Sequence, residues 1–273
     1  MKKLLAIAVT AALTAPMAAM ADTKVSGSAR MLLSLDSPAT LGNNGSRFRL
    51  TGENGIDNGL SMTHKFEFGA DPTNGTSGVS NRSSYIGFKG GFGEVRVGSD
   101  WTPMDKVDDG AEVLVNGSGA LQGTDGDRKG TIQYIGSFGG LGVMAMMAPK
   151  GNRVNTKAQV GVTYKAGPLY AGAALGSNVG DSSRQVSLAY SGANYKVGFV
   201  HANDGGDDSS NSVRGKYSFG KAWVAGMFTK KGDADHKALD LGYGLGKGTK
   251  VYLQIKKTDD NDASKAIGVQ HDF

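Results

Sequence analysis

Six carboxylates lie in one long stretch without a regular hydrophobic pattern, Thr102 to Asp127. Loops of this length are usually functional or disordered. An apolar centre, Val113-Leu114-Val115, favours packing against another part of the protein, although a mobile, solvated surface loop remains the alternative. Its acidic residues are Asp105, Asp108, Asp109, Glu112, Asp125 and Asp127.

Basic residues accumulate on the segments around this stretch. On a soluble protein they would be ordinary solvated surface charges. If their segments close into a barrel, they share one confined space with the carboxylates, and facing rows of opposite charge then act on anything that passes. These residues are Arg30, Arg47, Arg49, Lys65 and Arg96, with Arg82 and Arg128 close by in sequence.

Catalytic chemistry finds little support among the other residues. The chain has no cysteine, no Gly-x-Ser-x-Gly motif, and four histidines without zinc-ligand spacing. The sequence therefore predicts no catalytic residue, no metal site and no cofactor. A formal charge of +5 over 273 residues is too balanced to predict nucleic-acid binding.

Most of the chain after Thr23 alternates polar and apolar residues, which is the pattern of β-strands with one polar and one apolar face. The alternation is clear where Thr63, Lys65 and Glu67 interleave with Phe66 and Phe68. It leaves open which face is polar in 81–89, 141–149 and 222–230. Sixteen segments follow the pattern: 23–35, 46–53, 60–68, 81–89, 94–101, 129–136, 141–149, 158–165, 169–176, 184–190, 195–202, 212–219, 222–230, 236–244, 249–257 and 265–273.

The connections between these segments alternate in length. Short, Gly-rich turns at 90–93, 137–140, 166–168, 191–194, 220–221 and 246–248 alternate with longer polar loops at 36–45, 69–80, 150–157, 177–183, 203–211 and 258–264. Outer-membrane β-barrels have this topology, with turns on the periplasmic side and loops outside. The sequence thus predicts an all-β, antiparallel transmembrane barrel of sixteen strands. Fourteen strands and a soluble sandwich remain the alternatives, and the sandwich would be extracted without detergent.

Both ends of the chain fit an exported barrel. Lys2 and Lys3, a short apolar run and the small-x-small site Ala19-Met20-Ala21 predict a signal peptide over 1–21, which leaves 22–273 as the barrel. The apolar run is too short for a membrane-spanning helix. At the other end, the face that includes Phe273 is apolar, and pairing with the first strand would remove a free edge that invites aggregation.

Several segments in this order resemble the trimeric general porins of Gram-negative bacteria, in the broad proteobacterial and neisserial group. Each motif alone is loose, and their order together with the two ends of the chain makes the set specific. The motifs are Ser46-Arg47-Phe48-Arg49 before Asn58-Gly59-Leu60, Asn81-Arg82 with Tyr85-Ile86-Gly87-Phe88, Gly91 to Gly98, Tyr243 to Thr249 with Tyr252, and the terminal Phe273.

The resemblance implies a homotrimer and a third external loop, matching Thr102 to Asp127, that is folded into the channel. It also implies that Phe273 is the signal that the barrel assembly machinery reads. From the resemblance and the charge pattern together, the expected constriction has a basic wall of Arg30, Arg47, Arg49, Lys65, Arg82 and Arg128 opposite the acidic Asp105, Asp108, Asp109 and Glu112.

The expected function is a water-filled channel in the Gram-negative outer membrane, in contact with lipid and lipopolysaccharide, for passive diffusion of ions and small hydrophilic solutes. A basic excess on the polar face of the first five segments suggests a slight preference for anions. One rival is an outer-membrane enzyme of the phospholipase type, which would need a paired serine and histidine. The other is a solute-specific channel, for which Trp101 and Tyr252 are the candidate binding aromatics.

Overall fold

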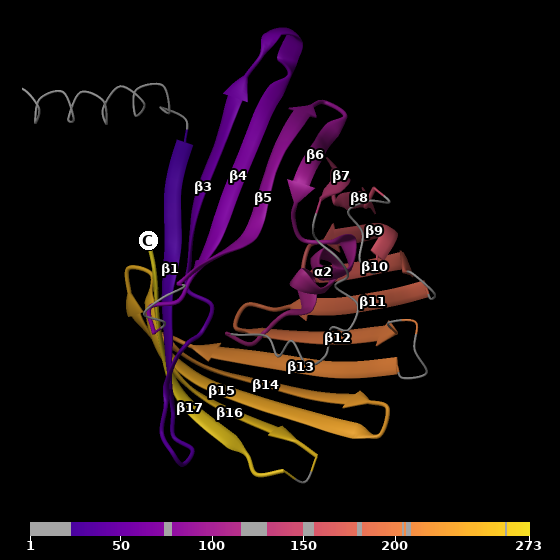
Figure 1. Ribbon diagram of the computed structural model, residues 1–273. Coiled ribbons are helices and arrows are strands. Elements are labelled where there is room, and N and C mark those ends of the chain that lie inside the picture. The colour runs from indigo at the N-terminus through magenta and orange to yellow at the C-terminus, as the bar shows by residue number, and fades with distance from the viewer. Residues whose placement is uncertain are drawn as a thin grey trace, which may run out of the picture.

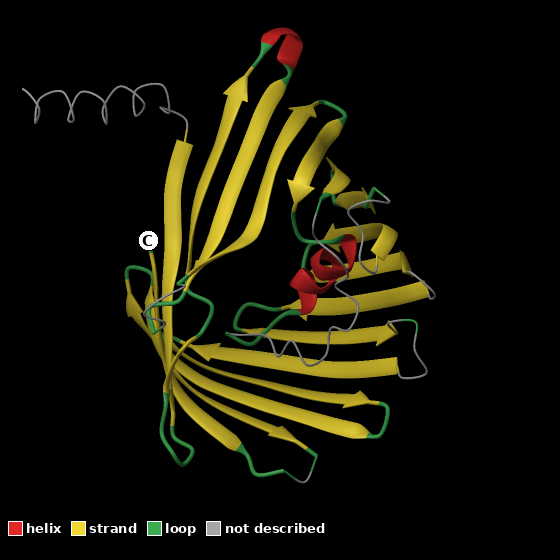
Figure 2. Cartoon of the chain, in the orientation of Figure 1, coloured by secondary structure: helices red, strands yellow, loops and turns green. Residues whose placement is uncertain are grey.

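The computed structural model describes residues 23–73, 78–115, 130–149, 156–178, 182–203, 205, 209–259 and 261–273. Over these ranges the chain forms one antiparallel sheet of seventeen strands that closes on itself, as Figures 1 and 2 show. One strand, β2 (Leu41–Asn43), has only three residues, so the barrel has sixteen long strands, as the sequence predicted. The expected signal peptide lies outside the described residues.

The sixteen segments expected from alternation all appear, with ends shifted by a few residues. The long strands are β1 (Thr23–Ser34), β3 (Arg47–Gly55), β4 (Ser61–Ala70), β5 (Val79–Gly90), β6 (Gly93–Ser99), β7 (Thr131–Phe138), β8 (Leu141–Met147), β9 (Thr156–Ala166), β10 (Leu169–Asn178), β11 (Ser182–Ser191), β12 (Tyr195–Asn203), β13 (Ser209–Phe219), β14 (Ala222–Lys231), β15 (Ala234–Gly246), β16 (Thr249–Thr258) and β17 (Ser264–Asp272).

The barrel closes where β1 pairs with β17, from Ser28 opposite Asp272 to Ser34 opposite Ala266. On its other edge β1 pairs first with β3 and then, further along, with β2. Between β2 and β3 the chain leaves the ladder over 44–46. The Ser46 hydroxyl stabilises this break, because it accepts a hydrogen bond from the Arg30 amide and donates one to the Arg30 carbonyl. β2 is therefore a continuation of β3 that period-two alternation does not detect.

Side chains on successive positions of each strand point alternately into the barrel and away from it. On β11, Gln185 and Ser187 are buried inside, whereas Val186 and Leu188 are 43% and 51% exposed on the outside. The same exposed apolar face runs round the barrel, which suits lipid and would aggregate in water. Tyr164, Tyr217 and Tyr243 add exposed aromatic rings close to the short turns.

Several short turns depend on glycine in the left-handed region. Gly167 and Gly220 have φ angles of 55° and 64°, which a side chain would strain. One connection on the loop side departs from the expected alternation, because β14 and β15 are joined by only Gly232 and Asp233. The φ of 56° at Gly232 makes that tight turn possible.

Two short 3₁₀ helices and one α-helix complete the described elements: η1 (Asp57–Gly59), α2 (Pro103–Asp108) and η2 (Asp109–Ala111). None of the described helices is long and apolar enough to cross a membrane.

Candidate pore constriction

The long connection between β6 and β7 begins with a helix that alternation could not show. The Thr102 hydroxyl accepts a hydrogen bond from the Asp105 amide at 3.3 Å, and the Asp105 carboxylate accepts one from the Thr102 amide at 2.9 Å. With Pro103 at the first helical position, this is a capping box. The Thr-Pro-x-Asp spacing is therefore the sequence signal that predicts α2.

Helix α2 lies inside the ring of strands and against the inner face of β9, β10 and β11 (Figure 1). Small residues on that face and on the neighbouring β12 let α2 and the following η2 come close. A Cβ at Gly172 would sit 2.8 Å from the Val107 carbonyl oxygen, and one at Gly198 would sit 2.8 Å from that of Ala111. The wall beneath the loop is thus fitted to a helix backbone.

Polar side chains of the wall fix the backbone of α2. Gln159 accepts a hydrogen bond from the Met104 amide and Gln185 donates one to the Met104 carbonyl, both at 3.1 Å. The hydroxyls of Tyr170 and Ser187 donate to the Val107 carbonyl. Such buried hydrogen bonds at both ends of the helix hold the loop in one place, since breaking any of them leaves a buried polar group without a partner.

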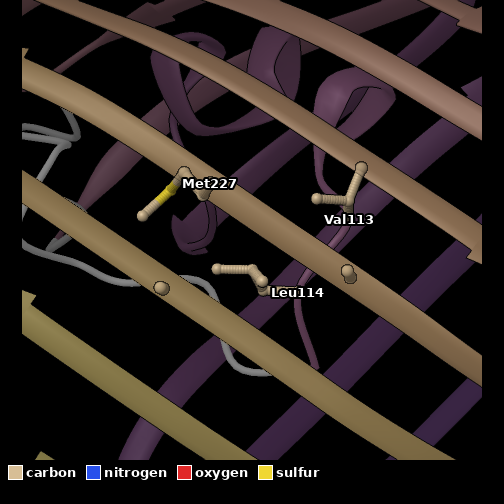
Figure 3. Packing of buried hydrophobic residues seen from close by; sticks show 5 residues of the cluster. Val113, Leu114 and Met227 are labelled. Atoms are coloured by element: carbon tan, nitrogen blue, oxygen red, sulfur yellow. The ribbon is translucent and has the colours of Figure 1, made fainter.

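The apolar centre of the loop packs as the sequence predicted. Val113 and Leu114 are each 6% exposed and contact Ala225, Met227 and Ala238 of β14 and β15 (Figure 3). The Val115 amide donates to Asp240 at 2.8 Å. The first part of the loop, 102–115, is therefore seated on the wall from β8 to β15.

A buried arginine that the sequence analysis did not single out ties the acidic part of the loop to this wall. Arg214 on β13 bonds Asp108 at 2.9 Å and Glu112 at 3.4 Å, and the Arg214 and Asp108 side chains are both 2% exposed. Arg214 lies on the polar parity of its strand with Ser210 and Ser212, so alternation placed it inside the barrel without revealing its partner.

The four expected carboxylates of the loop consequently differ in what they face. Asp105 caps the helix, Asp108 is buried against Arg214, and Glu112 keeps 33% of its side chain exposed. Asp109 is 73% exposed and has Lys106 at 4.0 Å. Enclosure within the barrel and the nearby negative charges of Asp108 and Glu112 raise the pKa of Asp109, although Lys106 opposes the shift.

Across the lumen, four basic side chains surround one buried carboxylate, Glu67. Its oxygens lie 3.1 Å from Arg82, 3.3 Å from Arg49, 3.7 Å from Arg47 and 3.8 Å from Lys65, and its side chain is 3% exposed. Lys65 also pairs with Asp100 at 3.5 Å. Arg30, next to this group on β1, donates to Ser28. We call Arg30, Arg47, Arg49, Lys65 and Arg82 the basic wall.

Arg82 reaches the basic wall through a β-bulge. Glu67 pairs with Ser83 and Phe68 pairs with Asn81, so Arg82 is the extra residue of β5. Regular alternation from Ser83 would turn Arg82 towards lipid. The bulge turns it inward instead, with its guanidinium 5.7 Å from the Trp101 ring centroid.

One cavity of about 400 Å³ joins the two sides. Of the expected site residues, Arg30 and Arg82 do not line it, and Arg128 lies outside the described residues. Tyr252 lies elsewhere, buried against the Asn44 amide. The cavity is lined by Arg47, Arg49, Lys65 and Glu67 from the strands and by Trp101, Asp105, Lys106, Asp108, Asp109 and Glu112 from the loop.

No group of histidines and carboxylates in the described ranges could hold a metal ion. The cavity inside the closed barrel is lined by fixed charges of both signs, which act on a solute through its charge and size. Residues 8–263 match the family model described as Gram-negative porin. The chain belongs to the Gram-negative porin family. Its described strands form the closed antiparallel β-barrel of an outer-membrane protein of this family.

Curated relatives are distant. The major outer membrane protein P.IB of Neisseria gonorrhoeae is 27% identical over 213 residues, which cover 68% of this chain and 60% of that protein. P.IB of Neisseria meningitidis serogroup B is 34% identical over 112 residues, or 36% of this chain and 33% of that protein. The porin matches therefore span at most about 60% of the length of these relatives.

Solved structures show the same fold. A mutant of the Rhodopseudomonas blastica porin has a TM-score of 0.78 at 16% identity and covers 92% of this chain and 100% of its own. A loop L8 deletion mutant of OmpT, an outer membrane protein of Vibrio cholerae, has a TM-score of 0.75 at 20% identity, covering 92% and 99%. The family model confirms the resemblance inferred from sequence motifs, and the solved structures confirm the fold.

Proposed function

We propose that this porin is a water-filled channel through which ions and small hydrophilic solutes cross the outer membrane by passive diffusion, with a weak preference for anions. The observation that carries the charge preference is the environment of Glu67, where four cations share one carboxylate. On the loop side, the ion pairs with Arg214 neutralise much of the negative charge of Asp108 and Glu112. Asp109 is left as the most exposed carboxylate of the cavity, opposite the cations around Glu67, and this contrast between the two sides supports the proposed anion preference.

The constriction of this channel is the cavity between the basic wall and the acidic loop. Its basic side is Arg30, Arg47, Arg49, Lys65, Arg82 and Arg128, and its acidic side is Asp105, Asp108, Asp109 and Glu112. These residues contribute unequally to the electric field in the constriction. Charges further away than about 8 Å are screened at physiological salt, so the residues that line the cavity dominate. Both signs are present, so neither cations nor anions are excluded.

Reconstitution of the purified protein in planar bilayers tests this function. We expect stepwise single-channel conductance and, under a KCl gradient, a small zero-current potential of the sign for chloride preference. Absence of conductance steps would refute the channel, and a potential of the opposite sign would refute the charge preference while leaving the channel intact.

The same proposal includes the partners and the route of the chain. The protein is exported by the leader over 1–21, the segment 22–273 is folded by the barrel assembly machinery with Phe273 as its signal, and three copies associate among outer-membrane lipid and lipopolysaccharide. Electrophoresis of gently extracted protein without boiling tests the trimer. A band near three times the monomer mass supports it, and a monomer alone counts against it.

A further inference from the structure

A second cavity lies in the lumen, on the turn side of the basic wall. Its volume is about 560 Å³, and it shares no lining residue with the cavity at the constriction. The strands that carry it run to the turn end of the barrel, where η1 joins β3 and β4 (red, at the top of Figure 2). We call it the turn-side cavity. Its charged lining residues are Lys24, Glu53, Lys89, Glu94 and Arg96.

The less exposed charges of the turn-side cavity are already paired. Arg96 lies 2.7 Å from Glu94 and 2.7 Å from Asp100. Its guanidinium also covers the Tyr85 ring, at 4.3 Å from the ring centroid. Thr63 donates a further hydrogen bond to Glu94. These groups satisfy one another, so they shape the cavity and leave the recognition of a solute to its other charges.

The other three charges are accessible, and their signs alternate. Glu53 pairs with Lys89 at 2.7 Å, yet the two side chains are 46% and 48% exposed. Lys24 is exposed and pairs with no carboxylate among the described residues. It is opposite Thr51, two positions before Glu53 on the same face of β3. Glu53 therefore lies between a lysine on β1 and a lysine on β5. We call Lys24, Glu53 and Lys89 the charge triad.

The charge triad is a poor match for a simple ion. A small anion at either lysine also meets Glu53, and a small cation at Glu53 meets two lysines. A solute with one ammonium between two carboxylates has the complementary order of signs, and complementary charges give specificity. Such a solute carries one net negative charge, and the triad, with two lysines and one glutamate, carries one net positive charge.

We propose that the turn-side cavity binds acidic amino acids, that is, aminodicarboxylates such as glutamate and aspartate. The ammonium of the solute bonds Glu53, and its two carboxylates bond Lys24 and Lys89. Lys89 has three N–H donors and Glu53 has two oxygens, so both can make these contacts while they keep their ion pair. The inference goes beyond passive diffusion, because it names a solute that is held, and it rests on the proposed function only in that the solute enters through the lumen.

Titration of the intact porin in detergent, followed by saturation-transfer NMR of the solute, tests the proposal. The probes are L-glutamate, glutarate, which lacks the ammonium, and γ-aminobutyrate, which lacks one carboxylate. The variants K24Q and E53Q each remove one charge of the triad. The matched control is D235N, which changes another carboxylate that pairs with a lysine, outside both cavities. Electrophoresis with and without boiling verifies that each variant is folded.

We expect the parent to bind glutamate about threefold more tightly than either glutarate or γ-aminobutyrate, as for exposed ion pairs. K24Q should weaken the binding of both dicarboxylates about threefold. E53Q should instead abolish the preference for glutamate over glutarate, because an amide neither attracts the ammonium as strongly nor repels a carboxylate. D235N should keep that preference.

Equal binding of glutamate and glutarate by the parent would overturn the proposal, as would an unchanged preference in E53Q or a lost preference in D235N. A merely structural role of Glu53 would weaken all three probes alike in E53Q. Binding is measured without ion flow, so a parent protein that fails to conduct in bilayers refutes the channel and leaves the binding result standing.

Discussion

The two inner walls of this barrel are built from opposite kinds of residue. The wall under the loop, on β8 to β15, presents Gly161, Gly172 and Gly198, with buried glutamines and serines that bond the loop backbone. The basic wall, on β1 and β3 to β5, carries long charged side chains, of which Arg47, Arg49 and Lys65 line a water-accessible cavity. The loop covers the first wall, whereas the basic wall borders the cavity.

This difference separates stability from selectivity within one sheet. Charges on the covered wall, above all Arg214, hold the loop in position, because an unpaired charge in that buried place is costly. Charges on the basic wall remain partly hydrated, so they cost less and act on passing ions. Substitutions on the two walls should therefore give effects of different kinds.

Replacing Arg214 with alanine should give the largest loss of stability. The change leaves Asp108 buried without its ion-pair partner, at a cost of about 3–5 kcal/mol. Denaturant unfolding in lipid vesicles measures the free energy of unfolding. The matched control is Arg184→Ala, which removes an exposed arginine from the outer face of β11 and should change that free energy by less than about 0.5 kcal/mol.

A double variant distinguishes the ion pair from the volume of the side chain. R214M with D108N removes both charges and should recover much of the stability lost in Arg214→Ala, since no uncompensated charge stays buried. If Arg214→Ala is no less stable than Arg184→Ala, the separation of the two walls is wrong.

Alternation predicted the barrel because each strand has one face towards lipid and one towards the lumen, and sixteen segments read in this way were confirmed. It could not predict the partners across the lumen. Arg214 and Asp108 are far apart in sequence, and only the seating of the loop brings them together. The bulge at Arg82 also breaks the period of two. The inward direction of the Arg82 side chain depends on how β5 pairs with β4, which the sequence of β5 alone does not reveal. A local signal did exist for α2, in the capping box that begins at Thr102.

Replacing Arg49 and Arg82 together with alanine should shift selectivity strongly and stability little. Two of the four cations around Glu67 are removed, so the zero-current potential in a KCl gradient should move towards cation preference. Glu67→Gln should move it the other way. Lys250 lies beside the basic wall, because Gln270 separates it from Arg30 in the strand register. Lys250→Ala should therefore shift the potential towards cation preference, but less than the double variant does. Unchanged potentials in all three variants would contradict the placement of the constriction.

The loop side should show a smaller and pH-dependent effect. The raised pKa of Asp109 means that its carboxyl takes up a proton at a pH above the ordinary value of 3.8. As the pH falls, the loop therefore loses negative charge and anion preference should increase. Asp109→Asn should shift the potential towards anions at neutral pH and flatten this pH dependence. Asp108→Asn should instead lower stability, and an equal shift of the potential in both variants would remove the distinction between the two carboxylates.

Deletion of Phe273 should leave conduction almost unchanged, because this residue belongs to neither inner wall. Its backbone exchanges two hydrogen bonds with Gly27, at 2.7 and 3.0 Å. We expect lower amounts of protein in the outer membrane, measured by fractionation and immunoblotting, and parental single-channel conductance in the molecules that assemble. Normal amounts of the deletion variant would argue against the role of Phe273 in assembly.

The seam between β1 and β17 sets the order in which the ring can form. Every other neighbouring pair of long strands is consecutive along the chain, so its loop-closure entropy is smaller than that of the seam, which joins the two ends of the chain. Pairings of such high contact order form late. Until then β1 and β17 are open edges able to pair with other chains, and a factor that shields those edges during this interval would decide how much of the protein completes its ring.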